Sequence, residues 1–196
     1  MKKAAHIRRW QKLRLHWNRR ASKQIFSGSV LKLLRAVLPV TAVPKLAAAF
    51  FHDKVNEFLE LASAYDGYIF GSPVHWAAAG GAITSFMDRV FYTAVCSGQK
   101  TFYLKPASAV VSARRAGTTA AFEQLNKYFM LMQMPVVASQ YWNMVHGVNA
   151  EEVKQDLEGL QTMRTLGRNM AFFTAVQRSR FAGWCSITTA GNASFY

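Results

Sequence analysis

Helical and strand-like patterns alternate regularly between residues 53 and 172, and this alternation constrains the fold more than any other feature of the chain. Three short apolar runs are predicted to be strands: 68–70, 107–111 and 135–139. Stretches with apolar residues at helical spacing alternate with these runs, at 53–64, 83–91, 118–133 and 150–172. The order α-β-α-β-α-β-α predicts an α/β domain.

The predicted strands are apolar without alternation, which is expected when helices cover both faces of a parallel sheet. Right-handed helical crossovers join such strands. Ligands of these sheets bind beyond the carboxyl ends of the strands. The unusual residues of the chain gather at those ends, in the segments 71–76, 112–117 and 140–143. We therefore expect a site built from these three loops.

The first loop, Gly71 to Trp76, combines a rigid strand exit with a flat apolar ring. A planar aromatic ligand with polar edges needs both features. A loop whose tryptophan covers the core explains the same residues equally well. His75 could donate a hydrogen bond or shuttle a proton, but a neutral structural histidine is the commoner case.

The second loop places Arg114 and Arg115 directly after a buried strand, which suits phosphate or another anion. Gly117 and the two threonines after it add amides and hydroxyls at the start of a helix, with Thr118 as its predicted cap. Two solvated surface arginines are the alternative interpretation of this loop.

Other reactive or aromatic side chains have ordinary explanations. Cys96 is expected to be a buried thiol, because no partner that would lower its pKa is evident. Tyr141 and Trp142 are expected in the core or in a subunit contact, and His146 in a solvated loop. We predict no catalytic side chain and no metal ligand, because the sequence shows no catalytic triad, zinc spacing or paired carboxylates.

The charge is unevenly distributed along the chain. The protein has 24 Lys and Arg against 10 Asp and Glu, a net charge of +14. All the acidic residues lie between Asp53 and Glu158, and residues 52–172 are neutral overall. This pattern predicts three parts: a basic segment 1–51, a domain 52–172 and a basic tail 173–196.

The runs 66–91, 109–147 and 156–173 resemble flavodoxin-like NAD(P)H-dependent FMN reductases, a family that includes iron–sulfur flavoproteins. The resemblance covers residues 52–172 and implies a flavodoxin-like three-layer sandwich with a parallel sheet. It implies that the first loop lines the flavin ring through Ser72, Pro73, Val74, His75 and Trp76. It also implies that the second loop closes the other side through Ser112, Ala113, Arg114, Arg115 and Gly117.

The same resemblance implies the chemistry. FMN would accept a hydride from NAD(P)H and then reduce a small-molecule electron acceptor. Members of the family are commonly homodimers or homotetramers. We therefore expect a homo-oligomer with neither nucleic acid nor a membrane as partner. A cytoplasmic location is expected because only two cysteines, Cys96 and Cys185, occur and they lie far apart in the chain.

The family begins with a strand, a phosphate-binding loop and a helix, and residues 1–51 contain none of them in readable form. In a reading frame shifted by one base, residues 1–26 are compatible with a phosphate-loop remnant, an amphipathic helix and a strand entry. We interpret residues 1–51 and 173–196 as frameshifted segments. The native first strand and phosphate loop would then be missing, and FMN binding would be weakened or absent.

Other interpretations of the basic ends stay open. Residues 1–51 could be a targeting peptide, because they are rich in Arg and lack acids. They could also be an arm that binds nucleic acid or a membrane surface, with steeply salt-dependent affinity. An inactive remnant without function is the third possibility.

Overall fold

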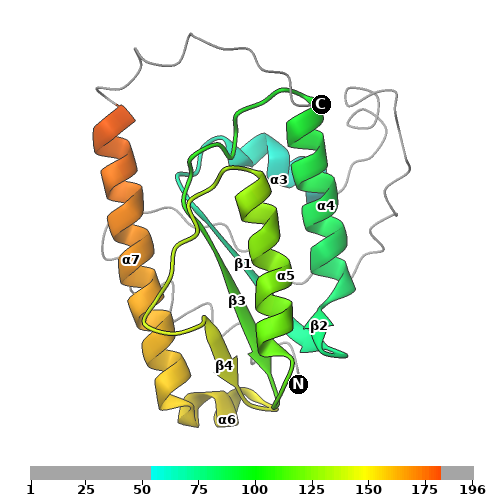
Figure 1. The fold of residues 1–196 in the computed structure, drawn as a ribbon, viewed down its shortest axis with the longest axis vertical. Helices are drawn as coiled ribbons and strands as arrows, with labels where there is room; N and C mark the ends of the chain where they lie inside the picture. Colours follow the sequence, from blue (N-terminus) through cyan, green and yellow to red (C-terminus); the bar gives the residue numbers. More distant parts are fainter. Residues whose placement is uncertain (1–53, 182–196) are drawn as a thin grey trace.

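The computed structural model describes residues 54–181, which form an α/β sandwich of three layers (Figure 1). Its elements are α3 (Lys54–Ala62), β1 (Tyr68–His75), β2 (Ala78–Ala79), α4 (Gly81–Cys96), β3 (Ala107–Ala113), α5 (Thr118–Leu131), β4 (Met144–His146), α6 (Ala150–Gln155) and α7 (Leu157–Phe181).

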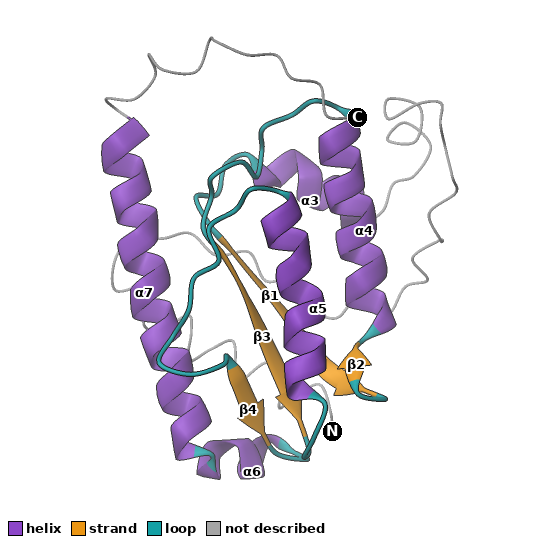
Figure 2. Cartoon of the chain, in the orientation of Figure 1, coloured by secondary structure: helices purple, strands orange, loops and turns teal. Residues whose placement is uncertain are grey.

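The sheet has the strand order β2-β1-β3-β4 (Figure 2). β1 and β3 pair in parallel from Tyr68↔Ala107 to Pro73↔Ser112, and β3 and β4 pair in parallel up to Ala113↔His146. The prediction of parallel strands is confirmed for β1 and β3, whereas β4 was not predicted. β2 was not predicted, and it pairs antiparallel with the end of β1.

The core lies on both faces of the sheet. β3 is buried at every position because helices cover it on either side. One apolar cluster joins the sheet to α3, α4 and α5, and the other joins it to α6 and α7. Aromatic rings dominate the first cluster, with the centroids of Phe58 and Phe86 5.3 Å apart and those of Phe91 and Phe102 5.1 Å apart. Such pairs contribute about 0.5–1.5 kcal/mol each beyond the area that they bury.

β1 is longer than predicted. Gly71 and Pro73 indicated a turn, but the strand continues through both residues to His75. Proline fits a strand at positions where the ladder does not need its missing N–H. Ser72, Pro73, Val74 and His75 therefore belong to a strand and not to a loop.

The predicted third strand, 135–139, is wrong. This segment forms no ladder with β3: the two are joined by one isolated parallel bridge, Ala107↔Val136, and by a hydrogen bond from Ser108 Oγ to Val137 O (2.8 Å). The chain leaves the sheet near Ser139 and returns as β4, where a polar loop was expected. Side-chain hydrogen bonds explain the detour, because the Asn143 amide donates to Ser108 Oγ (2.8 Å) and accepts from Ser139 Oγ (2.6 Å).

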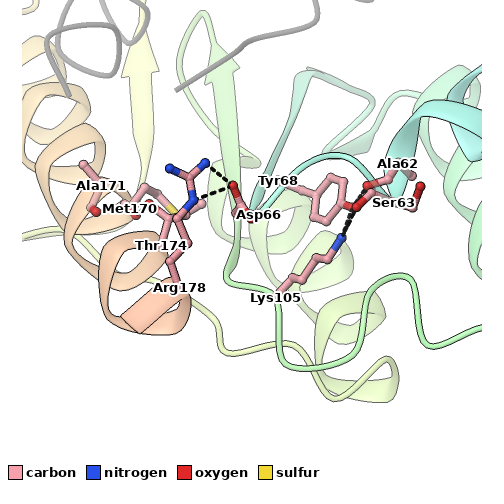
Figure 3. A network of polar contacts seen from close by, with 9 residues as sticks. All are labelled: Ala62, Ser63, Asp66, Tyr68, Lys105, Met170, Ala171, Thr174 and Arg178. Carbon is pink, nitrogen blue, oxygen red and sulfur yellow. Dashed lines mark hydrogen bonds and ion pairs between the residues drawn. The ribbon is translucent and has the colours of Figure 1, made fainter. Parts of the chain in front are cut away.

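The predicted last helix, 150–172, is two helices. They are divided at Asp156, whose carboxylate accepts the Gly159 N–H and so caps the start of α7. α7 continues past the predicted boundary at residue 172. Thr174 is buried, and Arg178 forms an ion pair with Asp66 before β1 (Figure 3). Whether residues 173–196 arise from a shifted frame stays a prediction, and residues 182–196 lie outside the described part.

A second set of polar contacts, made by Lys105 and Tyr68, lies near the amino end of β1 (Figure 3). Lys105 Nζ donates to the Ser63 carbonyl (3.1 Å) and the Ala62 carbonyl (3.4 Å) at the end of α3, and the Tyr68 hydroxyl donates to Ala62 O (2.5 Å). These donors satisfy carbonyls that a helix end leaves without partners. Burial lowers the pKa of Lys105 and raises the pKa of Tyr68 well above its ordinary value.

We expect the folding stability to fall as the pH rises above about 10, where tyrosines of the unfolded chain ionise. Burial raises the pKa values of Tyr68 and Tyr128, so the folded state keeps protons that the unfolded state loses. Urea unfolding between pH 8 and 11 should show a shallower decline for Tyr68→Phe. The control Tyr141→Phe changes an exposed ring. An equally steep decline in Tyr68→Phe and wild type would contradict this assignment.

Candidate functional site

The carboxyl ends of β1, β3 and β4 meet at one edge of the sheet, at the bottom of Figure 1. The register places Pro73 beside Ser112 and Ser112 beside Val145. The first two predicted loops therefore lie side by side, as expected. The third predicted loop, 140–143, precedes β4 and does not reach this edge. The segment after His146 lies at the carboxyl edge, where the loop 140–143 was predicted.

A two-residue turn, Trp76-Ala77, joins β1 to β2 at this edge. Both residues have positive φ, 49° for Trp76 and 62° for Ala77. Tight hairpins need this conformation and usually use Asn-Gly for it, because a Cβ makes it strained by about 1–2 kcal/mol per residue. The Trp76 side chain is fully exposed, with a relative accessibility of 102%. Trp76 therefore does not cover the core, which was the alternative explanation of this loop.

Gly117 brings the second loop against this turn. It has φ +87°, and a Cβ on it would lie 2.7 Å from Ala77 Cα and 2.9 Å from Val74 Cγ1. Only a residue without a side chain allows such a close approach. The two loops are thus in direct contact, and α5 begins at their junction.

Ser72 is inside the protein. It has no exposed surface, its hydroxyl donates to Pro73 O (2.8 Å), and it accepts the Gly80 N–H (2.8 Å). Gln124 Oε1, on α5, accepts the Ala79 N–H of β2 (3.1 Å). Gln124 could not be identified from the sequence, because it lies 45 residues from its partner and on a helix of ordinary amphipathic pattern. Both side chains hold the hairpin in place.

The predicted site residues divide by exposure. Ser112 and Ala113 are buried, and Pro73, Val74 and Gly117 are half-buried. Four side chains face solvent: His75, Trp76, Arg114 and Arg115. A flat ring, an imidazole and two cations are thus presented together at this edge.

The positive charge at this edge is not neutralised by the described residues. Within residues 54–181, Arg114 and Arg115 have no carboxylate within salt-bridge distance. The cap of α5 is Gly117 and not Thr118 as predicted, and Gly117 has no side chain to accept an amide at the start of the helix. Two guanidinium groups beside such a helix start attract an anionic group.

His146 lies at the end of β4 and not in a solvated loop. It pairs with Ala113, and its Nδ1 is 3.9 Å from Asp156 Oδ2. Asp156 also accepts the His146 N–H (2.7 Å). Ten residues separate the two groups, so only the fold reveals that they meet.

Two other predicted positions differ from the structure. Cys96 is exposed at the end of α4, so the expected burial of this thiol is wrong. Tyr141 and Trp142 are about half exposed, with ring centroids 4.9 Å apart, and are therefore outside the core. Their use in a subunit contact stays a prediction.

No helix within residues 54–181 is both long and apolar enough to cross a membrane. The same residues contain no group of three or more His, Cys, Asp or Glu side chains that could hold a metal ion.

Comparison with known proteins identifies relatives. The family model of NADPH-dependent FMN reductase matches residues 11–149. An iron–sulfur flavoprotein of Methanocaldococcus jannaschii is 29% identical over 124 residues, which are 61% of this chain and 64% of that protein. The chain thus spans slightly less than two thirds of that relative's length.

Two solved structures show the fold. RosB, crystallised with a bound 8-demethyl-8-formylriboflavin-5′-phosphate intermediate, superposes with a TM-score of 0.62 at 12% identity, over 87% of this chain and 74% of RosB. A WrbA-like flavodoxin from Agrobacterium tumefaciens gives 0.51 at 16% identity, over 65% of this chain and 74% of its own. The predicted flavodoxin-like fold class is therefore confirmed.

The family match begins upstream of the predicted domain boundary at residue 52. Residues 11–51, which we interpreted as frameshifted, fall within it. They also lie outside the described part of the structure. The frameshift hypothesis therefore stays a prediction that the coding DNA can test.

Proposed function

The chain belongs to the NADPH-dependent FMN reductase family, and from its site we propose that it is a flavin-dependent oxidoreductase that holds FMN at the carboxyl edge of the sheet. One observation carries the proposal. The Trp76 turn and the arginine loop meet at Gly117, whose missing side chain allows their contact. A flat apolar surface and a pair of cations are therefore parts of one site.

The exposed residues fit FMN. Trp76 offers a free ring face against which an isoalloxazine can pack, and Arg114 and Arg115 offer charge to an anionic group. FMN, when bound, supplies the two-electron chemistry by accepting a hydride and passing electrons on. The protein binds and orients the cofactor and limits water at one ring face. We assign no catalytic side chain.

NAD(P)H is the proposed electron donor, and a small molecule such as a quinone or free flavin is the proposed acceptor. The family supports a nicotinamide donor. Oxidation of NADPH and of NADH by the full chain, with and without added FMN, is the direct assay. If the chain does not oxidise NADPH or NADH faster than free FMN does, the proposed activity is contradicted.

We further propose that this chain binds FMN weakly. Residues 1–51 contain no readable phosphate loop, and the flavin phosphate would lack its usual donors. Equilibrium titration of the purified chain with FMN should give a Kd above about 1 μM. Submicromolar affinity would contradict the proposed impairment but not the proposed function.

Trp76→Ala tests the position of the flavin. Loss of one aromatic contact of about 0.5–1.5 kcal/mol should raise the Kd for FMN about two- to tenfold. Trp142→Ala is the matched control, because Trp142 is also exposed but precedes β4, away from the carboxyl edge. Quenching of flavin fluorescence measures both. Equal Kd values for Trp76→Ala and wild type would exclude the assigned ring position.

A further inference from the structure

The Trp76-Ala77 turn needs support from its surroundings. Within residues 54–181, the non-glycine residues with positive φ are Trp76, Ala77, Leu104 and Gln133, and only the first two are adjacent. Strained backbone of this kind persists only where neighbouring structure over-determines it. The exposed Trp76 ring supplies no packing of its own. The support therefore comes from the strands and from the helix behind them.

Three contacts surround the turn, one from β1, one from the cap of α5 and one from α5 itself. Ser72 Oγ holds the Gly80 N–H from the β1 side. Gly117 lies directly against Ala77, and Gln124 Oε1 accepts the Ala79 N–H. Gly117 caps the start of α5 and Gln124 lies within the first half of that helix, so both contacts reach the hairpin from the same end of α5. Gly117 contacts the hairpin at its turn, and Gln124 holds its second strand, β2.

We propose that Gln124 is a positioning residue of the flavin site. It fixes β2 on α5 and thereby fixes the turn that carries Trp76. This inference rests on the proposed function for its effect on FMN, but the structural link from Gln124 to Trp76 does not depend on it. Gln124 lies on the helix and reaches the site through the Ala79 amide.

The residue type matters because the contact is made by an acceptor. Gln124→Met keeps the length of the side chain and removes the oxygen, so the part-buried Ala79 N–H loses its partner. Gln124→Glu keeps an oxygen at the same reach and should restore the contact. Glu123→Gln is the control on α5, because Glu123 is exposed.

The experiment has a cofactor-free arm and an FMN arm, both on the full chain. Trp76→Phe assigns the indole N–H signal of Trp76 in two-dimensional NMR. We expect one sharp signal in wild type, Gln124→Glu and Glu123→Gln, and a broadened or doubled signal in Gln124→Met. The Kd for FMN should rise about three- to tenfold in Gln124→Met and less than about twofold in Gln124→Glu.

The outcomes separate the two hypotheses. An unchanged Trp76 signal in Gln124→Met, or equal changes in the Met and Glu variants, overturns the positioning role. If wild type binds no FMN, the proposed function fails while the NMR arm still decides the role of Gln124. If Gln124→Met does not fold, amide exchange in wild type decides it. The Ala79 N–H should exchange at least about tenfold more slowly than an unstructured amide, and fast exchange overturns the inference.

Discussion

Replacing Gly117 with alanine will lower the free energy of unfolding by about 2–5 kcal/mol. The φ of +87° strains any residue with a Cβ by about 1–2 kcal/mol. The new methyl would also lie 2.7 Å from the Ala77 backbone, an overlap that typically destabilises by about 1–3 kcal/mol. Urea unfolding measures the loss. The Kd for FMN should rise as well, because the hairpin must shift away from the arginine loop.

Gly98→Ala is the matched control for this substitution. Gly98 also has positive φ, +66°, but a Cβ on it would meet nothing within 4 Å. The free energy of unfolding of Gly98→Ala should fall by about 1–2 kcal/mol, the contribution of the left-handed backbone alone. If the free energy of unfolding falls by the same amount in both variants, the contact between Gly117 and the hairpin contributes nothing to the stability. The proposed meeting of the two loops would then need another explanation.

The sequence predicted those elements whose pattern is local. The apolar run 107–111 identified β3, and helical spacing identified α4 and α5 to within a few residues. β2 escaped prediction because Trp-Ala replaces the Asn-Gly that usually indicates a tight hairpin. That turn depends on contacts from α5, which no local pattern contains.

The location of the candidate site could be predicted from the sequence, but the roles of its supporting residues could not. The resemblance located the two loops, and the structure places them side by side. It could not show that Ser72 is fully buried or that Gln124 supports the hairpin, because both facts depend on contacts between separate elements. His146 was misplaced for the same reason, since β4 forms only after the detour that Asn143 holds.

The second large effect is expected at Asn143, the centre of that detour. Its side chain is 1% exposed, donates to Ser108 Oγ and accepts from Ser139 Oγ. Asn143→Ala removes both hydrogen bonds and leaves a small cavity, which together should lower the free energy of unfolding by about 2–4 kcal/mol. Urea unfolding at neutral pH measures this loss.

Two further variants test the two hydrogen-bond partners of the Asn143 amide. Ser139→Ala removes the hydrogen bond to Asn143 Oδ1 and the exposed contacts of the same hydroxyl with the Tyr141 backbone. The free energy of unfolding should fall by only about 0.5–1.5 kcal/mol, because this end is more exposed. The double variant Ser108→Ala/Asn143→Ala should lose less free energy of unfolding than the sum of the losses in the two single variants. The reason is that the two side chains share one hydrogen bond. Strict additivity would mean that the buried network does not hold the chain in its detour. The failure of the predicted strand at 135–139 would then need a cause in the backbone itself.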